Sequence, residues 1–171
     1  IEMLKALAHE VRIGGLIGGK AGIMHIHVGD GKEGLGPLSN LIEQSEFPIE
    51  MFVPTHLNRN KNLLEQAVQY SLKGGNIDLT AGENSETGVA VADALQELLN
   101  KGVNIEKITV SSDGNGSIPL QGGNTSGVGD VGELFKDIIK CILDKKIPMD
   151  TALKTVTSNV SKLLKLYPQK G

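Results

Sequence analysis

The chain has 171 residues, 39% hydrophobic and 22% charged, which is enough for one domain with a substantial core. Its formal net charge is −3, and its aromatic residues are two Tyr and three Phe. A nucleic-acid partner is therefore disfavoured, because such proteins carry a basic surplus and stacking rings. The apolar stretches are all well short of the ~20 residues that span a bilayer, so no membrane association is expected. The single cysteine, Cys141, excludes an internal disulfide and favours a reducing compartment, hence a cytoplasmic location.

The two ends of the chain indicate a part of something larger. Residues Ile1–Val11 carry apolar side chains at helical spacing, with no capping residue before them. The glycine pairs at 14–15 and 18–19 are typical of a helix stop and turn. The chain begins without Met and without a signal-peptide pattern, and it stops just after another helical segment. We expect a domain that is truncated at both ends.

Short apolar runs alternate with longer helical patterns along the chain. The predicted strands are Gly22–Val28, Met51–Thr55, Asn76–Thr80 and Lys107–Ser112. The predicted helices cover about Gly34–Gln44, Asn62–Leu72, Val89–Asn100, Val131–Leu143 and Asp150–Leu166. This rhythm predicts one α/β unit of parallel strands with crossover helices. Both a doubly wound sheet and part of a (β/α)₈ barrel fit it.

Polar side chains gather at the carboxyl ends of these strands, where parallel α/β proteins place their function. His25 and His27 end the first strand, His56 follows the second and Asp113 follows the fourth. Imidazole and carboxylate ligands from separate strands suit a metal that activates water, with zinc favoured. The alternative is that these are ordinary core or loop histidines. From the residues alone, both interpretations stay open.

Three further features, the glycine-rich run after the fourth strand, Arg59 and Cys141, each have a structural explanation to weigh against a functional one. The run Asp113–Ser117 is rich in glycine, but it lacks the lysine of a phosphate-binding loop, so a tight turn with left-handed glycines is favoured. Arg59 is either a solvated surface charge or a bidentate partner for a substrate carboxylate. Cys141 lies among apolar residues at helical spacing and is expected in the core.

Four strings of residues together resemble the isoaspartyl dipeptidases, which are metal-dependent members of the amidohydrolase superfamily. They are Gly14–Lys20, His27–Asp30, Pro54–Asn60 and Ser111–Ser117, and they occur in order along essentially the whole chain. The third and fourth strings are specific to that family, whereas other amidohydrolases share only the histidines and the aspartate.

The resemblance implies a (β/α)₈ barrel with two zinc ions, of which this chain is the second half, strands five to eight. His27 and His56 then resemble the strand-five and strand-six ligands of one zinc. Asp113 resembles the strand-eight aspartate, which binds the other zinc and takes a proton from the bridging hydroxide. Arg59 matches an arginine that holds a substrate carboxylate, and Ser117 matches a serine that contacts the aspartyl end of the substrate.

The resemblance also implies what this chain does not contain. A paired-histidine strand and a carboxylated lysine would precede Ile1, and a small flanking β domain is absent. His25 imitates the paired histidines, but its neighbours place it on strand five, so we interpret it as a near-site residue and not a ligand.

The implied activity of the complete enzyme is zinc-dependent hydrolysis of β-aspartyl dipeptides. The chain alone is expected to be inactive and to associate with a second copy or with the missing half. The alternatives are another amidohydrolase that acts on a different amide, or a non-catalytic fragment or binding module.

Overall fold

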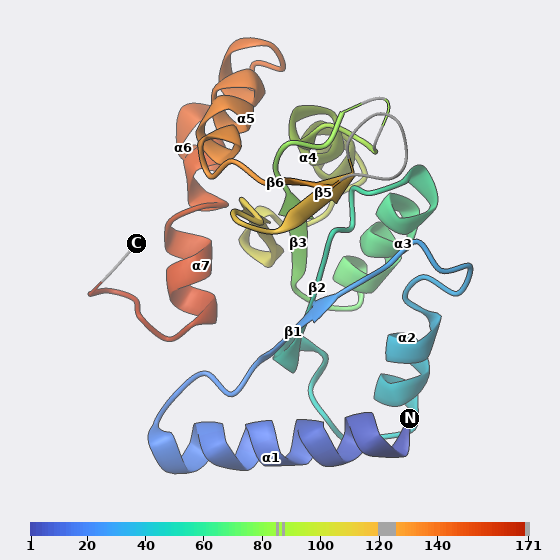
Figure 1. Cartoon of the computed structure of the whole chain (residues 1–171). Helices are drawn as coiled ribbons and strands as arrows, with labels where there is room; N and C mark the ends of the chain where they lie inside the picture. Colours follow the sequence, from blue (N-terminus) through green and yellow to red (C-terminus); the bar gives the residue numbers. More distant parts are fainter. Residues whose placement is uncertain (85, 87, 120–125, 170–171) are drawn as a thin grey trace.

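The computed structural model describes residues 1–84, 86, 88–119 and 126–169 (Figure 1). At its centre lie four short parallel strands, β1 (Met24–His27), β2 (Phe52–Thr55), β3 (Ile77–Thr80) and β4 (Ile108–Ser111). β1 pairs with β2 and β3 pairs with β4, and the backbone N–H of Leu57 donates to the carbonyl of Asp78 to link the two pairs. The predicted α/β class with parallel strands is confirmed, and each strand is slightly shorter than its apolar run.

Helices follow the strands and supply the rest of the core. They are α2 (Gly36–Glu43), α3 (Lys61–Leu72), α4 (Val91–Asn100) and α5 (Gly132–Leu143), and short 3₁₀ turns at Ile49–Met51 and Ile105–Lys107 lead into β2 and β4. Leu95 and Leu98 on α4 are fully buried in one core cluster with Phe52 and Leu79 of the strands. Cys141 belongs to the same cluster, which confirms its expected place in the core.

The opening helix α1 (Glu2–Gly18) is longer than the sequence pattern predicts (Figure 1). The expected stop at Gly14–Gly15 is wrong, because the helix continues through both residues. A Cβ on Gly15 would lie 2.5 Å from the Cα of Gly22, so this glycine permits close backbone packing instead of ending the helix. The stop at Gly18–Gly19 is confirmed, with Gly19 in the left-handed conformation typical of a helix end.

The final helical segment is also interrupted. The expected single helix over Asp150–Leu166 is two short helices, α6 (Met149–Lys154) and α7 (Ser158–Leu163), joined by a turn. The carbonyl of Thr155 in this turn accepts from the backbone N–H of Val110, and the amide of Asn159 donates to the carbonyls of Ile105 and Ile108. The outer edge of β4 is thereby covered, and these bonds explain why the helix breaks at that point.

A small antiparallel hairpin follows β4 that the sequence did not predict. It consists of β5 (Ser117–Pro119) and β6 (Ser126–Val128), and the backbone of Asn115 and Gly116 bonds to Gly129 at its base. These three-residue strands are too short to show an alternating pattern in the sequence.

Among the described residues, no helix is both long enough and apolar enough to cross a membrane.

Candidate active site

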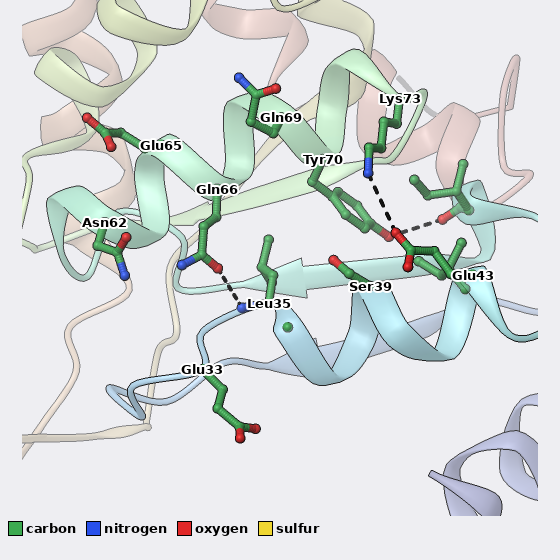
Figure 2. Close-up of a pocket in the computed structure, with 13 residues that line it drawn as sticks. Glu33, Leu35, Ser39, Glu43, Asn62, Glu65, Gln66, Gln69, Tyr70 and Lys73 are labelled. Carbon is green, nitrogen blue, oxygen red and sulfur yellow. Dashed lines mark hydrogen bonds and ion pairs between the residues drawn. The ribbon is translucent and has the colours of Figure 1, made fainter.

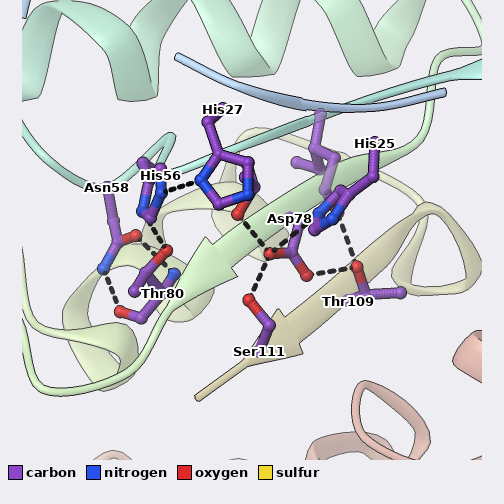
Figure 3. Close-up of polar contacts among 10 residues, drawn as sticks. His25, His27, His56, Asn58, Asp78, Thr80, Thr109 and Ser111 are labelled. Carbon is purple, nitrogen blue, oxygen red and sulfur yellow. Dashed lines mark hydrogen bonds and ion pairs between the residues drawn. The ribbon is translucent and has the colours of Figure 1, made fainter. Parts of the chain in front are cut away.

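Two imidazole rings meet at the carboxyl ends of β1 and β2. His27 is the last residue of β1 and His56 directly follows β2, and His27 Nδ1 lies 2.8 Å from His56 Nε2. Asp113 follows β4 by two residues, and one ligand atom from each of the three side chains lies within 4.8 Å of the others. Figure 3 shows the two rings side by side. The structure thus brings together the three residues that the sequence singles out as metal ligands.

The ring of His56 is held by a contact with the neighbouring strand β3. Its Nδ1 lies 2.8 Å from the hydroxyl of Thr80, the last residue of β3, and the side chain is buried. Burial lowers the pKa of His56 below 6.5, and the nearby Arg59 lowers it further. His56 is therefore neutral at neutral pH, which is the state in which a histidine binds a metal.

The chemistry of these donors fits a zinc ion. Two imidazole nitrogens and a carboxylate are a donor set that zinc accepts, with N–Zn distances of about 2.0–2.1 Å. Nitrogens bound at that distance in tetrahedral geometry stand about 3.3 Å apart, so the two rings need to separate by only about 0.5 Å from the observed hydrogen bond. His27 and Asp113 are less buried than His56, which leaves one side of the group open to water and substrate.

Asp113 lies in a tight turn whose geometry differs from the expected one. The left-handed residues are Asp113 and Asn115, with φ of 47° and 67°, and not the glycines between and after them. At both glycines there is no space for a side chain. A Cβ on Gly114 would lie 2.2 Å from a methyl of Val131, and one on Gly116 would lie 2.8 Å from the Asp113 carbonyl oxygen. The turn is confirmed, but its glycines serve close packing.

The sequence analysis missed a buried carboxylate, that of Asp78, which lies near the three candidate ligands. Asp78 on β3 is 3% exposed and accepts hydrogen bonds from the hydroxyls of Thr55, Thr109 and Ser111, all at 2.5–2.6 Å. Its Oδ2 also lies 3.8 Å from Nε2 of His25 (Figure 3). All four parallel strands thus contribute to one polar cluster. An acid between two fully buried apolar residues, Ile77 and Leu79, was the signal that could have revealed it.

His25 belongs to this cluster and not to the metal-ligand group. It shares the face of β1 with His27, and the two ring centroids are 5.6 Å apart. The nearby Asp78 carboxylate raises the pKa of His25 above 6.5, although partial burial opposes this. The ring lies next to the site and is directed to the Asp78 carboxylate.

Arg59 and Ser117 are the two residues that the sequence predicts to contact the substrate. Arg59 follows His56 by three residues, and its guanidinium donates to the carbonyl of Val28 at 3.3 Å. This bond leaves other N–H groups of the five that a guanidinium carries for a ligand. Ser117 is the first residue of β5, and the described structure includes its backbone but not the position of its side chain.

A separate cavity of about 510 Å³ lies between α2 and α3 (Figure 2). The polar groups along it serve the fold: Gln66 accepts from the backbone of Leu35, and the Tyr70 hydroxyl bonds to the carbonyls of Ile49 and Phe52. None of the three candidate ligands lines it.

Comparisons with known proteins agree with the geometry. No protein-family model matches the sequence. One solved structure, a beta-aspartyl dipeptidase from the thermophilic keratin-degrading Fervidobacterium islandicum AW-1 in complex with a beta-Asp-Leu dipeptide, matches with a TM-score of 0.88 and 38% identity. The match covers 99% of this chain and 45% of that one. A second structure of a beta-aspartyl dipeptidase from the same organism matches with a TM-score of 0.81 and 36% identity, over 96% of this chain and 41% of that one.

The chain therefore spans less than half the length of the dipeptidases that it matches. The likeness extends over nearly all of its own residues, at an identity well above the level at which only the fold is shared. The resemblance indicated by the sequence motifs is confirmed: this chain is similar, in sequence and in fold, to part of the beta-aspartyl dipeptidases.

Proposed function

We propose that the complete protein hydrolyses β-aspartyl dipeptides and that His27, His56 and Asp113 bind zinc in its active site. The observation that carries the proposal is the convergence of these three side chains at the strand ends, in a chain 38% identical to a beta-aspartyl dipeptidase. When bound, zinc would acidify a water molecule and polarise the β-aspartyl carbonyl. A site for two zinc ions requires ligands beyond these three.

Each of the proposed residues has a distinct task. The rings of His27 and His56 offer nitrogen ligands, and the carboxylate of Asp113, close to both rings, would take a proton from the attacking water and give it to the leaving amine. Arg59 binds a carboxylate of the dipeptide through its planar fork. Ser117 contacts the aspartyl end of the substrate.

The proposed architecture is the second half, strands five to eight, of a (β/α)₈ barrel. Four parallel strands in sequence order, with helices between them, support it, as does a match that covers 45% of the dipeptidase chain. The remaining strands and a small β domain would lie in further chain. We place the protein in the cytoplasm, because its single cysteine is fully buried and the fold needs no disulfide.

The test uses the complete purified protein. We expect about two zinc ions per chain by elemental analysis, and hydrolysis of β-Asp-Leu but not of α-Asp-Leu. His56→Ala should lose bound zinc and activity together, because it removes a buried ligand. A protein that retains its zinc in this variant, or that cleaves only α-aspartyl dipeptides, contradicts the proposal.

The 171-residue chain by itself should not turn over the substrate. Three ligands from the described residues are too few for the proposed two-zinc site. We expect the isolated chain to associate with a second copy or with the remaining barrel, because among the described residues β1 pairs with β2 alone. Sedimentation together with a β-Asp-Leu assay tests both statements, and full activity in a monomeric preparation contradicts them.

A further inference from the structure

The contact between His56 and Thr80 bears on which nitrogen of the histidine is available to a metal. His56 has two ring nitrogens, and a neutral imidazole carries its hydrogen on one of them. Nε2 lies in the ligand group beside His27, while Nδ1 lies 2.8 Å from the Thr80 hydroxyl oxygen. If Nδ1 carries the hydrogen and donates it to Thr80, the lone pair of Nε2 is directed into the ligand group.

The backbone of Thr80, which carries this hydroxyl, is held in place by Asn58. Asn58 is fully buried, and its side chain bonds to both backbone groups of Thr80: the Thr80 N–H donates to Oδ1 at 2.8 Å, and Nδ2 donates to the Thr80 carbonyl at 2.9 Å. Nδ2 also donates to the carbonyl of Val89, whose N–H donates to the Asn58 carbonyl. An asparagine amide, with a donor and an acceptor side by side, extends the pairing of the two strands beyond their ends.

The backbone of His56 shows why such support is needed. Its φ is +65°, a left-handed conformation that costs a residue with a side chain about 1–3 kcal/mol unless its surroundings enforce it. The Arg59 N–H bonds to the His56 carbonyl at 3.0 Å, and the next residue in the turn, Leu57, is fully buried. The backbone is thus fixed by the turn, and the rotation of the ring is fixed by Thr80.

We propose that Thr80 is a positioning residue of the metal site: its hydroxyl accepts the Nδ1 hydrogen of His56 and so presents Nε2 as a ligand. This inference rests on the proposed function, because it assigns a partner to one of the proposed zinc ligands. Loss of such a partner typically weakens metal affinity about 10–100-fold.

Two substitutions of Thr80 in the complete protein separate the hydroxyl from the shape of the side chain. Thr80→Val keeps the branched shape and removes the hydroxyl, and Thr80→Ser keeps the hydroxyl. The matched control is Thr109→Val, since Thr109 is 6% exposed against 5% for Thr80 and its hydroxyl bonds to Asp78 and to the Ile77 carbonyl, not to His56.

The main measurement is zinc affinity by competition with a chromophoric chelator. Thr80→Val should bind zinc about 10–100-fold more weakly, whereas Thr80→Ser and Thr109→Val should stay within about 3-fold of the wild type. Thermal unfolding of the metal-free proteins is measured alongside. A residue that serves only the fold would lower the melting temperature without changing zinc affinity, and wild-type affinity in Thr80→Val therefore overturns the inference.

A second measurement holds even if Thr80→Val does not fold. Nitrogen-15 NMR of the imidazoles in the zinc-loaded wild type should show the hydrogen of His56 on Nδ1. A hydrogen on Nε2, or zinc bound through Nδ1, overturns the inference while leaving zinc binding intact. A wild-type protein that binds no zinc overturns the proposed function, and this inference falls with it.

Discussion

His25 on β1 and Asp78 on β3 face each other across the intervening strand β2, with the histidine Nε2 3.8 Å from the carboxylate Oδ2. Burial alone would raise the pKa of Asp78, but His25 and the hydroxyls of Ser111, Thr109 and Thr55 outweigh it, and the pKa lies below 3.8. The carboxylate is therefore charged although it is buried, and it joins the two strand pairs from inside the sheet.

Asp78→Asn should destabilise the protein by about 1–3 kcal/mol, because an amide cannot accept from all the groups that surround the carboxylate. A carboxyl whose pKa is depressed in the folded state contributes stability above its unfolded value of about 3.9, and this contribution is lost as the pH falls through the folded value. The difference between wild type and variant should therefore be full at pH 5–7 and shrink below about pH 4.

Urea denaturation of both proteins across this pH range checks the expectation. A difference that is the same at pH 3 as at pH 6 would show that Asp78 is not charged in the fold. The facing titratable group, His25, is half exposed, and the same series with His25→Gln controls for it.

Arg59→Lys in the complete protein should lower kcat/KM for β-Asp-Leu about 10–100-fold, because an ammonium group cannot replace a planar fork that binds a carboxylate with two parallel bonds. The matched control is Arg12→Lys on an exposed turn of α1, which should leave the kinetics unchanged. Wild-type kinetics in the Arg59 variant would return this residue to the class of solvated surface charges.

Gly88→Ala should destabilise the loop that leads from β3 to α4. The added Cβ would lie 2.7 Å from the carbonyl oxygen of Asn58 and 2.8 Å from that of Arg59, both backbone atoms that cannot easily move. We expect a loss of about 1–3 kcal/mol in the free energy of unfolding, measured by chemical denaturation.

The control for this variant is Gly14→Ala in α1, where a Cβ would meet no described atom within 4 Å beyond the neighbouring helix backbone. That change should stabilise the protein by up to about 1 kcal/mol, because alanine favours a helix more than glycine does. Equal effects of the two substitutions would contradict the close packing at Gly88.

Cys141 should resist alkylation in the folded protein. Burial raises the pKa of its thiol to about 11, so only about a thousandth of it is thiolate at pH 8, and the side chain has no exposed surface. Mass spectrometry after iodoacetamide treatment at pH 8 should find the native protein unmodified and the urea-unfolded protein fully modified. Rapid labelling of the native state would show that α5 opens readily.

The sequence predicted the parts of this structure that depend on local pattern. Apolar runs located β1 to β4, and the polar residues after them located His27, His56 and Asp113. It could not reveal the three hydroxyl partners of Asp78, because Thr55 on β2 and Thr109 and Ser111 on β4 are brought to this β3 residue only by folding. The fixed ring of His56 was equally hidden, since Thr80, whose hydroxyl contacts it, lies 24 residues further along the chain.

The glycines were the least reliable indicators of where helices end and the chain turns. The sequence pattern predicts that Gly15 and Gly114 end or turn the chain, whereas in the structure neighbouring atoms leave no room for a Cβ at either residue. A glycine selected for space and one selected for its dihedral freedom look identical in a single sequence. The break between α6 and α7 was unpredictable for a related reason, since it depends on a bond between Thr155 and the distant Val110.

The bond between Val110 and Thr155 makes the outer edges of β1 and β4 differ in how many of their backbone groups are already bonded. In the described residues β1 pairs with β2 alone, whereas at β4 the Val110 N–H is bonded to Thr155 and the carbonyls of Ile105 and Ile108 are bonded to Asn159. A further strand can add to β1 without displacing any of these groups. One that adds to β4 must first displace the bond from Val110 to Thr155 and the bond from Asn159 to Ile108, each worth about 0.5–1.5 kcal/mol. In the closed barrel proposed above, the strand that pairs with β4 would therefore have to replace these contacts, whereas a strand could pair with β1 directly.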